Sequence, residues 1–145
     1  MKRNFLGLLA LGLAFSACNN LTNENIQLQK EVIAVHDSIM PKMGSFVRDD
    51  LKIGILLSKM DSLKKVNPNL DTASEKQQLA NLQTDLKHTN EAMTDWMHDF
   101  DPVQENKKPE EVQSYLNDQL KKIQALKQHF SEVEEESQRV LERYK

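Results

Sequence analysis

The chain has 145 residues, of which 28% are charged and 6% are aromatic, and it contains four glycines, four prolines and one cysteine. Few Gly, Pro and aromatic residues beside abundant Lys, Glu, Gln and Leu are typical of long helices. The 22 acidic and 19 basic residues give a formal charge of −3, which argues against nucleic acid as a partner. A single cysteine excludes a disulfide bond within the chain.

The first 18 residues, MKRNFLGLLALGLAFSAC, have the parts of an export signal: a basic start, an apolar run and small residues before a cysteine. The run is too short to cross a membrane as a stable anchor. We interpret residues 1–17 as a lipoprotein signal peptide and Cys18 as the lipid-modified first residue of the mature chain. An ordinary cleavable secretion signal is the alternative. Loss of Lys2 and Arg3 leaves 17 basic and 22 acidic residues, so the formal charge moves from −3 to −5.

A lipid on Cys18 predicts that the membrane is the first partner of the chain. Several acyl chains on one residue anchor a protein stably, whereas a single chain does not. Asn19 and Asn20 stand where an aspartate would favour retention at the inner membrane. We therefore expect the outer membrane, with the protein facing the periplasm or the cell surface. Residues 18–24 are expected to form a short tether, and residues 25–145 a single helical bundle.

A first helix is predicted from about residue 22 to residue 65. A second apolar stripe on it, formed by Ile33, Met40 and Val47 at seven-residue spacing, makes its face broad enough to touch two other helices. The main stripe alternates steps of four and three, as one face of a helix requires. It consists of Val32, His36, Ile39, Met43, Phe46, Asp50, Ile53, Leu57 and Met60.

The segment HDSIMPKMG places a proline and a glycine inside this first helix. Pro41 has no N–H to donate to the carbonyl of Asp37, and an interior proline costs a helix about 3 kcal/mol or more. With Gly44 beside it, this residue predicts a helix that is kinked near Pro41, or a boundary between two shorter helices.

A second helix is predicted from about residue 72 to residue 100, opened by a capping box at Thr72-Ala73-Ser74-Glu75. A turn around Pro68 precedes it, and the polar loop DPVQENKKP follows it. Its apolar stripe consists of Leu79, Leu82, Leu86, Thr89, Met93, Trp96 and Phe100.

A third helix is predicted from about residue 109 to residue 143, with Pro109 in its first turn. Long helices of this coiled-coil type predict an all-α fold, an antiparallel three-helix bundle. Asp50 and Gln119 interrupt the stripes with polar side chains, which in coiled coils set register or partner choice. The stripe of the third helix consists of Val112, Leu116, Gln119, Ile123, Leu126, Phe130, Val133, Ser137, Val140 and Tyr144.

Folding the helices back on one another predicts that Met40 lies level with His98, Met43 with Asp95, and Leu116 with Met93. Thioethers and an imidazole favour Cu(I), so a soft-metal site is one interpretation of the resulting group. Packing is the interpretation we favour, because methionine fills gaps against aromatic edges, and we assign no metal and no cofactor. The group contains His36, Met40, Met43, Met93 and Met97, with Trp96, Phe100 and Tyr115 as its packing cluster.

Other groups of residues give weaker indications of a metal site or a catalytic site. Asp95, His98 and Asp101 have the spacing of a metal cluster, but a solvated acidic helix end explains them with fewer assumptions. Paired Glu-x-x-His motifs for a di-iron site, phosphate loops and nucleophile elbows are absent from the mature sequence. We therefore expect no enzyme activity and infer no small-molecule substrate.

The segments VHDSIMPKMG and MTDWMHDFD resemble a family of small bacterial lipoproteins that are often labelled "viral A-type inclusion protein". The resemblance covers most of the mature chain and implies a lipid anchor followed by a helical bundle. The family has no established activity. We expect a membrane-anchored structural or protein-interaction module of the cell envelope, acting through a protein partner or through self-association. Periplasmic Cu(I) binding is the alternative.

Overall fold

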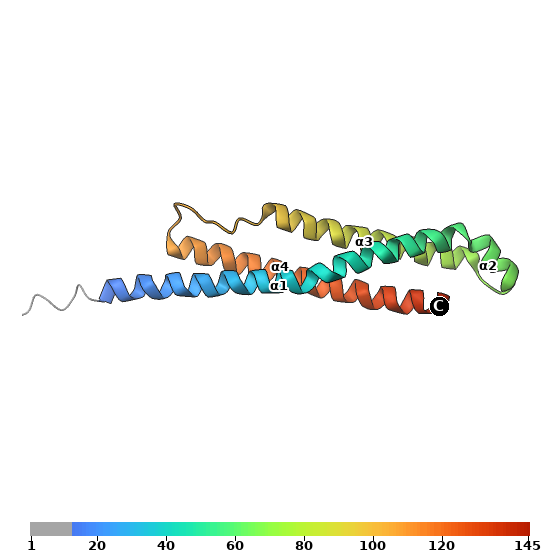
Figure 1. The fold of residues 1–145 in the computed structure, drawn as a ribbon, viewed down its shortest axis with the longest axis horizontal. Helices are drawn as coiled ribbons and strands as arrows, with labels where there is room; N and C mark the ends of the chain where they lie inside the picture. The colour runs from blue at the N-terminus through green and yellow to red at the C-terminus, as the bar shows by residue number, and fades with distance from the viewer. Residues whose placement is uncertain (1–12) are drawn as a thin grey trace, which may run out of the picture.

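The computed structural model describes the backbone of residues 13–145 and the side chains from residue 21 onward. Its elements are α1 (Leu13–Ser58), α2 (Met60–Val66), α3 (Thr72–Asp99), α4 (Pro109–Leu141) and a short 3-10 helix, η1 (Glu142–Tyr144). The all-α class is confirmed, because no strand occurs within these residues. Figure 1 shows an elongated molecule in which α1 and α4 run side by side in one direction and α3 runs in the opposite direction.

α1 starts earlier and ends earlier than the first predicted helix. It begins at Leu13, so residues 18–24, the predicted tether, are part of the helix. No glycine or proline interrupts the chain between Leu13 and Pro41, and the helix can therefore extend toward the N-terminus. The predicted helix also breaks at Lys59, which separates α1 from α2. The pattern hides this break, because Met60 keeps the seven-residue spacing and remains fully buried.

Pro41 lies inside α1, and helical geometry continues through it to Ser58. A boundary between two shorter helices at Pro41 is therefore wrong. α1 is nevertheless not straight: in Figure 1 its turquoise second half rises away from the line of its blue first half. A proline removes one hydrogen bond and crowds the preceding turn, and a helix adapts by bending.

Side chains form hydrogen bonds with the backbone where α3 and α4 begin. Asp71, not Thr72, caps α3, and its carboxylate accepts hydrogen bonds from the backbone N–H of Ala73 and of Ser74, each at 3.2 Å. The predicted capping box is thus wrong by one residue, since Glu75 points instead toward the end of α4. At the start of α4 the Lys108 N–H donates to the carboxylate of Glu111 at 3.0 Å.

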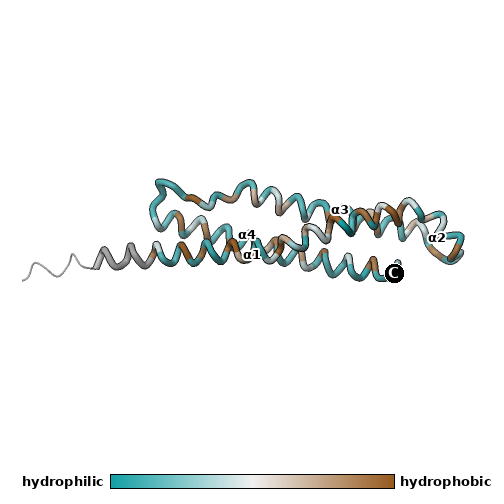
Figure 2. The backbone as a smooth tube through the Cα atoms, viewed as in Figure 1, coloured by the Kyte–Doolittle hydropathy of each residue, from teal (hydrophilic) through white to brown (hydrophobic). Residues whose placement is uncertain are grey.

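The core follows the three predicted main stripes. Figure 2 shows that hydrophobic residues recur along the whole length of the helices and do not gather at one end. Phe46 of α1 stacks on Phe130 of α4, with ring centroids 5.0 Å apart, in the middle of the core. The buried apolar residues are Val32, Ile39, Phe46, Ile53, Met60, Leu79, Leu82, Leu86, Met93, Trp96, Leu116, Ile123, Phe130, Val133, Val140 and Leu141.

The register between helices differs from the predicted one. Asn90, not Asp95, lies beside Met43, and its amide donates to the Met43 carbonyl at 3.3 Å. Between α3 and α4 the difference is larger, because Trp96 lies beside Gln119 and Lys122. Residues 100–108 cause this shift, since they run past the end of α3 before α4 begins (Figure 1). The predicted register assumes a tight turn at this position.

Candidate functional site

Four rings from three parts of the chain form a continuous row where α3 ends. His36 of α1 stacks on Trp96 of α3, with centroids 5.7 Å apart. Trp96 stacks on Phe100 at 4.9 Å, and Phe100 on Tyr115 of α4 at 6.3 Å. We call these four residues the aromatic row. The structure thus brings together the three residues expected in the packing cluster and adds the histidine to them.

The aromatic row also holds the 100–108 loop. The Tyr115 hydroxyl accepts a hydrogen bond from the Asp101 N–H at 2.8 Å, and the ammonium of Lys107 lies 5.6 Å from the centre of the Tyr115 ring. A cation over an aromatic face is attracted by the ring quadrupole. Asn106 has a φ of 63°, a left-handed conformation that Asn tolerates better than most residues. These contacts explain why the loop runs along α4 instead of turning back tightly.

The four methionines of the predicted group occupy different environments. Met93 is fully buried, and Met43 and Met97 are half-buried against the core. Met40 is 38% exposed and is not among the side chains that pack on the core. The expected juxtaposition of all four sulfurs at one end of the bundle is therefore wrong for Met40. The reason is its position on the second stripe of α1, which lies outside the face that packs on the core.

His36 uses its ring for contacts other than a metal. Its Nδ1 lies 3.0 Å from a carboxylate oxygen of Asp37, and one face of the ring covers Trp96. His98, at the end of α3, is largely exposed beside Asp99. Among the residues whose side chains the structure describes, no group of three His, Cys, Asp or Glu side chains could hold a metal ion.

A cavity of about 510 Å³ lies between α3 and α4 beside the aromatic row. Trp96 and Gln119 line it, and the indole N–H of Trp96 is buried without a hydrogen-bond partner among the described residues. Lys122 at the rim is paired with Asp118 at 2.7 Å. Its lining combines this buried donor and the Gln119 amide with the apolar side chains of Ala125 and Leu126, and the carboxylate of Asp99 lies with Lys122 at the exposed rim.

The two polar interruptions of the core stripes differ from each other. Asp50 is half-buried, and its carboxylate lies 3.5 Å from the ammonium of Lys87 on α3. Gln119 is 6% exposed, and its side chain makes no hydrogen bond to any described residue. Only Asp50 thus has the polar partner on a facing helix that a register-setting residue needs.

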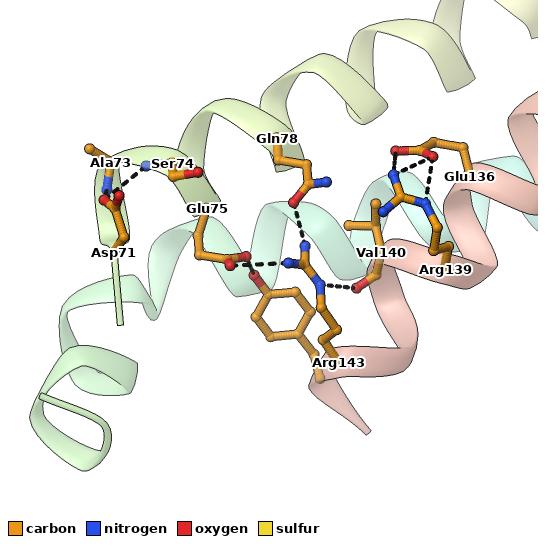
Figure 3. Close-up of polar contacts among 10 residues, drawn as sticks. Asp71, Ala73, Ser74, Glu75, Gln78, Glu136, Arg139, Val140 and Arg143 are labelled. Atoms are coloured by element: carbon orange, nitrogen blue, oxygen red, sulfur yellow. Dashed lines mark hydrogen bonds and ion pairs between the residues drawn. The ribbon is translucent and has the colours of Figure 1, made fainter. Parts of the chain in front are cut away.

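At the other end of the molecule, polar side chains tie the end of α4 to the start of α3 (Figure 3). Arg143 pairs with Glu75 at 3.2 Å and donates to Gln78, and the Tyr144 hydroxyl donates to the same Glu75 carboxylate. Burial of the Tyr144 ring, followed by its hydrogen bond to Glu75, raises the pKa of Tyr144 to about 12. The cluster closes this end of the bundle.

α1 contacts both α3 and α4, as predicted, but its second stripe lies outside the core. Ile33, Met40 and Val47 are 39%, 38% and 53% exposed, and they are not among the side chains that pack on the core. Leu51 and Ile55 continue the stripe with 64% and 54% exposure. α3 and α4 together cover only one side of α1, so the face that carries these residues stays open to solvent.

Comparison of the chain with models of known families, with curated proteins and with solved structures finds no match. The assignment of a function therefore depends on the residues themselves. The predicted signal peptide 1–17 lies mostly outside the described residues, and the predicted lipidation site, the Cys18 side chain, lies wholly outside them. Within the described part of the chain, no helix has the length and apolar character needed to cross a membrane.

Proposed function

We propose that this protein is a membrane-anchored helical lipoprotein that acts as a protein-interaction or structural module of the cell envelope. Its core is a three-helix bundle of α1, α3 and α4, with α3 antiparallel to the other two, and it has no catalytic role. The observation that carries the proposal is the open apolar face of α1. Exposed apolar patches of this kind, rimmed by polar residues, mark sites of protein interaction.

The anchor in this proposal is a lipid on Cys18, held in the outer membrane and facing the periplasm or the cell surface. Its support is the order of basic, apolar and small residues before the single cysteine. The resemblance of VHDSIMPKMG and MTDWMHDFD to the small lipoproteins labelled "viral A-type inclusion protein" agrees with it. The acidic charge of the chain favours a protein partner over nucleic acid.

The anchor is tested by labelling cells with radioactive palmitate. The unchanged chain should take up label, and Cys18→Ala should remain an unlabelled, unprocessed precursor. Ser16→Thr leaves the cysteine in place and serves as the control for a change in the same segment. Label on the Cys18→Ala chain would show that the lipoprotein interpretation is wrong.

The interaction role is tested by capture of the full-length protein from detergent-solubilised membranes, followed by identification of what is bound. Leu51→Asp places a charge on the open face without touching the core, so it should abolish capture. Lys121→Asp makes a similar change at an exposed position of α4, away from that face, and should leave capture intact. Equal capture by both variants would contradict the role of the α1 face.

A further inference from the structure

The open side of α1 is most apolar between Met40 and Ser58. Exposed positions in this stretch carry a single charged side chain, Arg48, and its guanidinium donates to the Ser45 hydroxyl of the same helix at 2.8 Å. The large side chains that point outward are 38–64% exposed. We call this surface the outer face: Met40, Pro41, Gly44, Val47, Leu51, Gly54 and Ile55.

Packing within the molecule does not require glycine at either of two positions on the outer face. A Cβ on Gly44 would meet only the flexible end of Arg48, at 3.6 Å, and a Cβ on Gly54 would meet nothing within 4 Å. Glycine is disfavoured inside a helix relative to alanine, so an exposed glycine weakens α1 without improving its packing. Small residues on a helix surface let a second helix approach closely, and the outer face offers such an approach from outside.

Small and large residues of the outer face lie at equal distances from the midpoint between Val47 and Arg48, so their sizes are complementary. Gly44 and Pro41 lie on the N-terminal side, whereas Leu51 and Gly54 lie at matching distances on the C-terminal side. A two-fold axis through the centre would therefore place Leu51 of a second copy over Gly44. Self-complementary pairing of one patch with itself is the usual form of a homodimer interface.

Charge at the two ends of the outer face favours the same antiparallel pairing. Asp37 lies on this side of α1 before Met40, and Lys59 follows Ser58 at the other end; both are exposed. An antiparallel second copy brings each Asp37 to a Lys59. A parallel copy would oppose Asp37 to Asp37 and would leave a void between two Gly44 residues.

We propose that the outer face binds the same face of a second copy of this chain, antiparallel, about a two-fold axis near Val47. The inference names the partner of the interaction module proposed above and therefore rests on that function. The two anchors would lie at opposite ends of the pair, so the dimer would lie along the membrane surface.

The test uses the full-length protein in its own membranes, with one cysteine added to each variant and a bismaleimide reagent that spans the about 8–10 Å between packed helix axes. Val47→Cys, at the axis, should give a cross-linked dimer. Ile26→Cys, 21 residues before Val47, should give none, because an antiparallel pair places the Ile26 positions of its two copies about 60 Å apart. The unchanged chain gives the background from Cys18, and Lys121→Cys gives the background from random contact.

Cross-linking at both Val47 and Ile26 would show a parallel pair and would overturn the proposal. Cross-linking at neither position would also overturn the proposed dimer. The interaction role would still stand in that case if a different protein were captured through Leu51. A second variant, Leu51→Asp in the Val47→Cys chain, should reduce cross-linking at least tenfold with unchanged helix content. If Leu51→Asp instead abolished flotation with phosphatidylethanolamine vesicles and Val47→Cys gave no dimer, the occupant of the outer face would be the lipid surface.

Discussion

α1 carries two apolar stripes with the same spacing and opposite environments. Val32, Ile39, Phe46 and Ile53 are seven residues apart and at most 1% exposed. Ile26, Ile33, Met40 and Val47 are also seven residues apart, and they are 38–53% exposed. The exposed stripe is offset from the buried stripe by one residue, as from Phe46 to Val47, which is about 100° around the helix. Spacing therefore identifies a stripe, whereas the number of covering helices decides whether it is buried.

The largest effect that distinguishes the two stripes is expected from truncation at these neighbouring positions. Phe46→Ala removes a ring that stacks on Phe130 and leaves a cavity, which should lower the free energy of unfolding by about 3–5 kcal/mol. Val47→Ala should change it by about 0.5 kcal/mol or less, as surface substitutions do. Urea unfolding followed by circular dichroism, at low protein concentration, measures both.

Similar losses from both substitutions would mean that the outer stripe is covered within a single copy. Repeating the Val47→Ala measurement at high protein concentration adds a control, since a loss that appears only there belongs to the association of copies.

The sequence alone predicts the all-α class, the bounds of α3 and α4 to within two residues, and the buried stripes, because periodicity reports directly on burial. The first predicted helix, residues 22–65, misses both the start of α1 at Leu13 and its end at Ser58. The sequence misses the break at Lys59, since a good helix former stands there and Met60 keeps the pattern. It misses the register of α4 because loop length alone does not say that residues 100–108 run past the end of α3. The exposure of Met40 and Val47 is missed because a pattern cannot count neighbouring helices.

The polar residues on the buried stripes provide the second prediction. Gln119→Leu should raise the free energy of unfolding by about 1 kcal/mol, because it extends the apolar stripe at a side chain that is 6% exposed and makes no hydrogen bond to any described residue. Asp50→Leu should change it by about 1 kcal/mol or less, since it also removes the half-exposed pair with Lys87. Thermal unfolding of each single variant separates the two. Destabilisation by Gln119→Leu would contradict the unpaired environment of this amide.

The third prediction concerns Tyr144, which packs against the end of the buried stripes. Because its ordinary pKa of 10.0 is raised to about 12, first by burial and then by the hydrogen bond to Glu75, the folded protein holds this proton more tightly than the unfolded chain. The resulting stabilisation is complete below about pH 10 and is lost as the pH rises through about 12.

Tyr144→Phe should cost about 1 kcal/mol near neutral pH and should remove the ultraviolet transition of a tyrosinate that forms near pH 12. Tyr115→Phe is the matched control, since Tyr115 is the other of the two tyrosines in the chain. A transition near pH 12 that persists in Tyr144→Phe would contradict the assignment to Tyr144.

The smallest effects are expected from methionine exchange, which compares a buried position of α3 with an exposed position of α1 without changing side-chain volume. Met93→Leu should cost under about 1.5 kcal/mol, and Met40→Leu should have no measurable effect, because one side chain is fully buried and the other faces solvent. Leucine keeps the shape of methionine but removes the sulfur ligand, so the same variants test the Cu(I) interpretation. We expect the full-length protein in detergent to take no Cu(I) from a competing chelator of micromolar affinity. Stoichiometric transfer that disappears in the Met93→Leu and Met40→Leu variants would instead show that Met40 of α1 and Met93 of α3 meet around a metal.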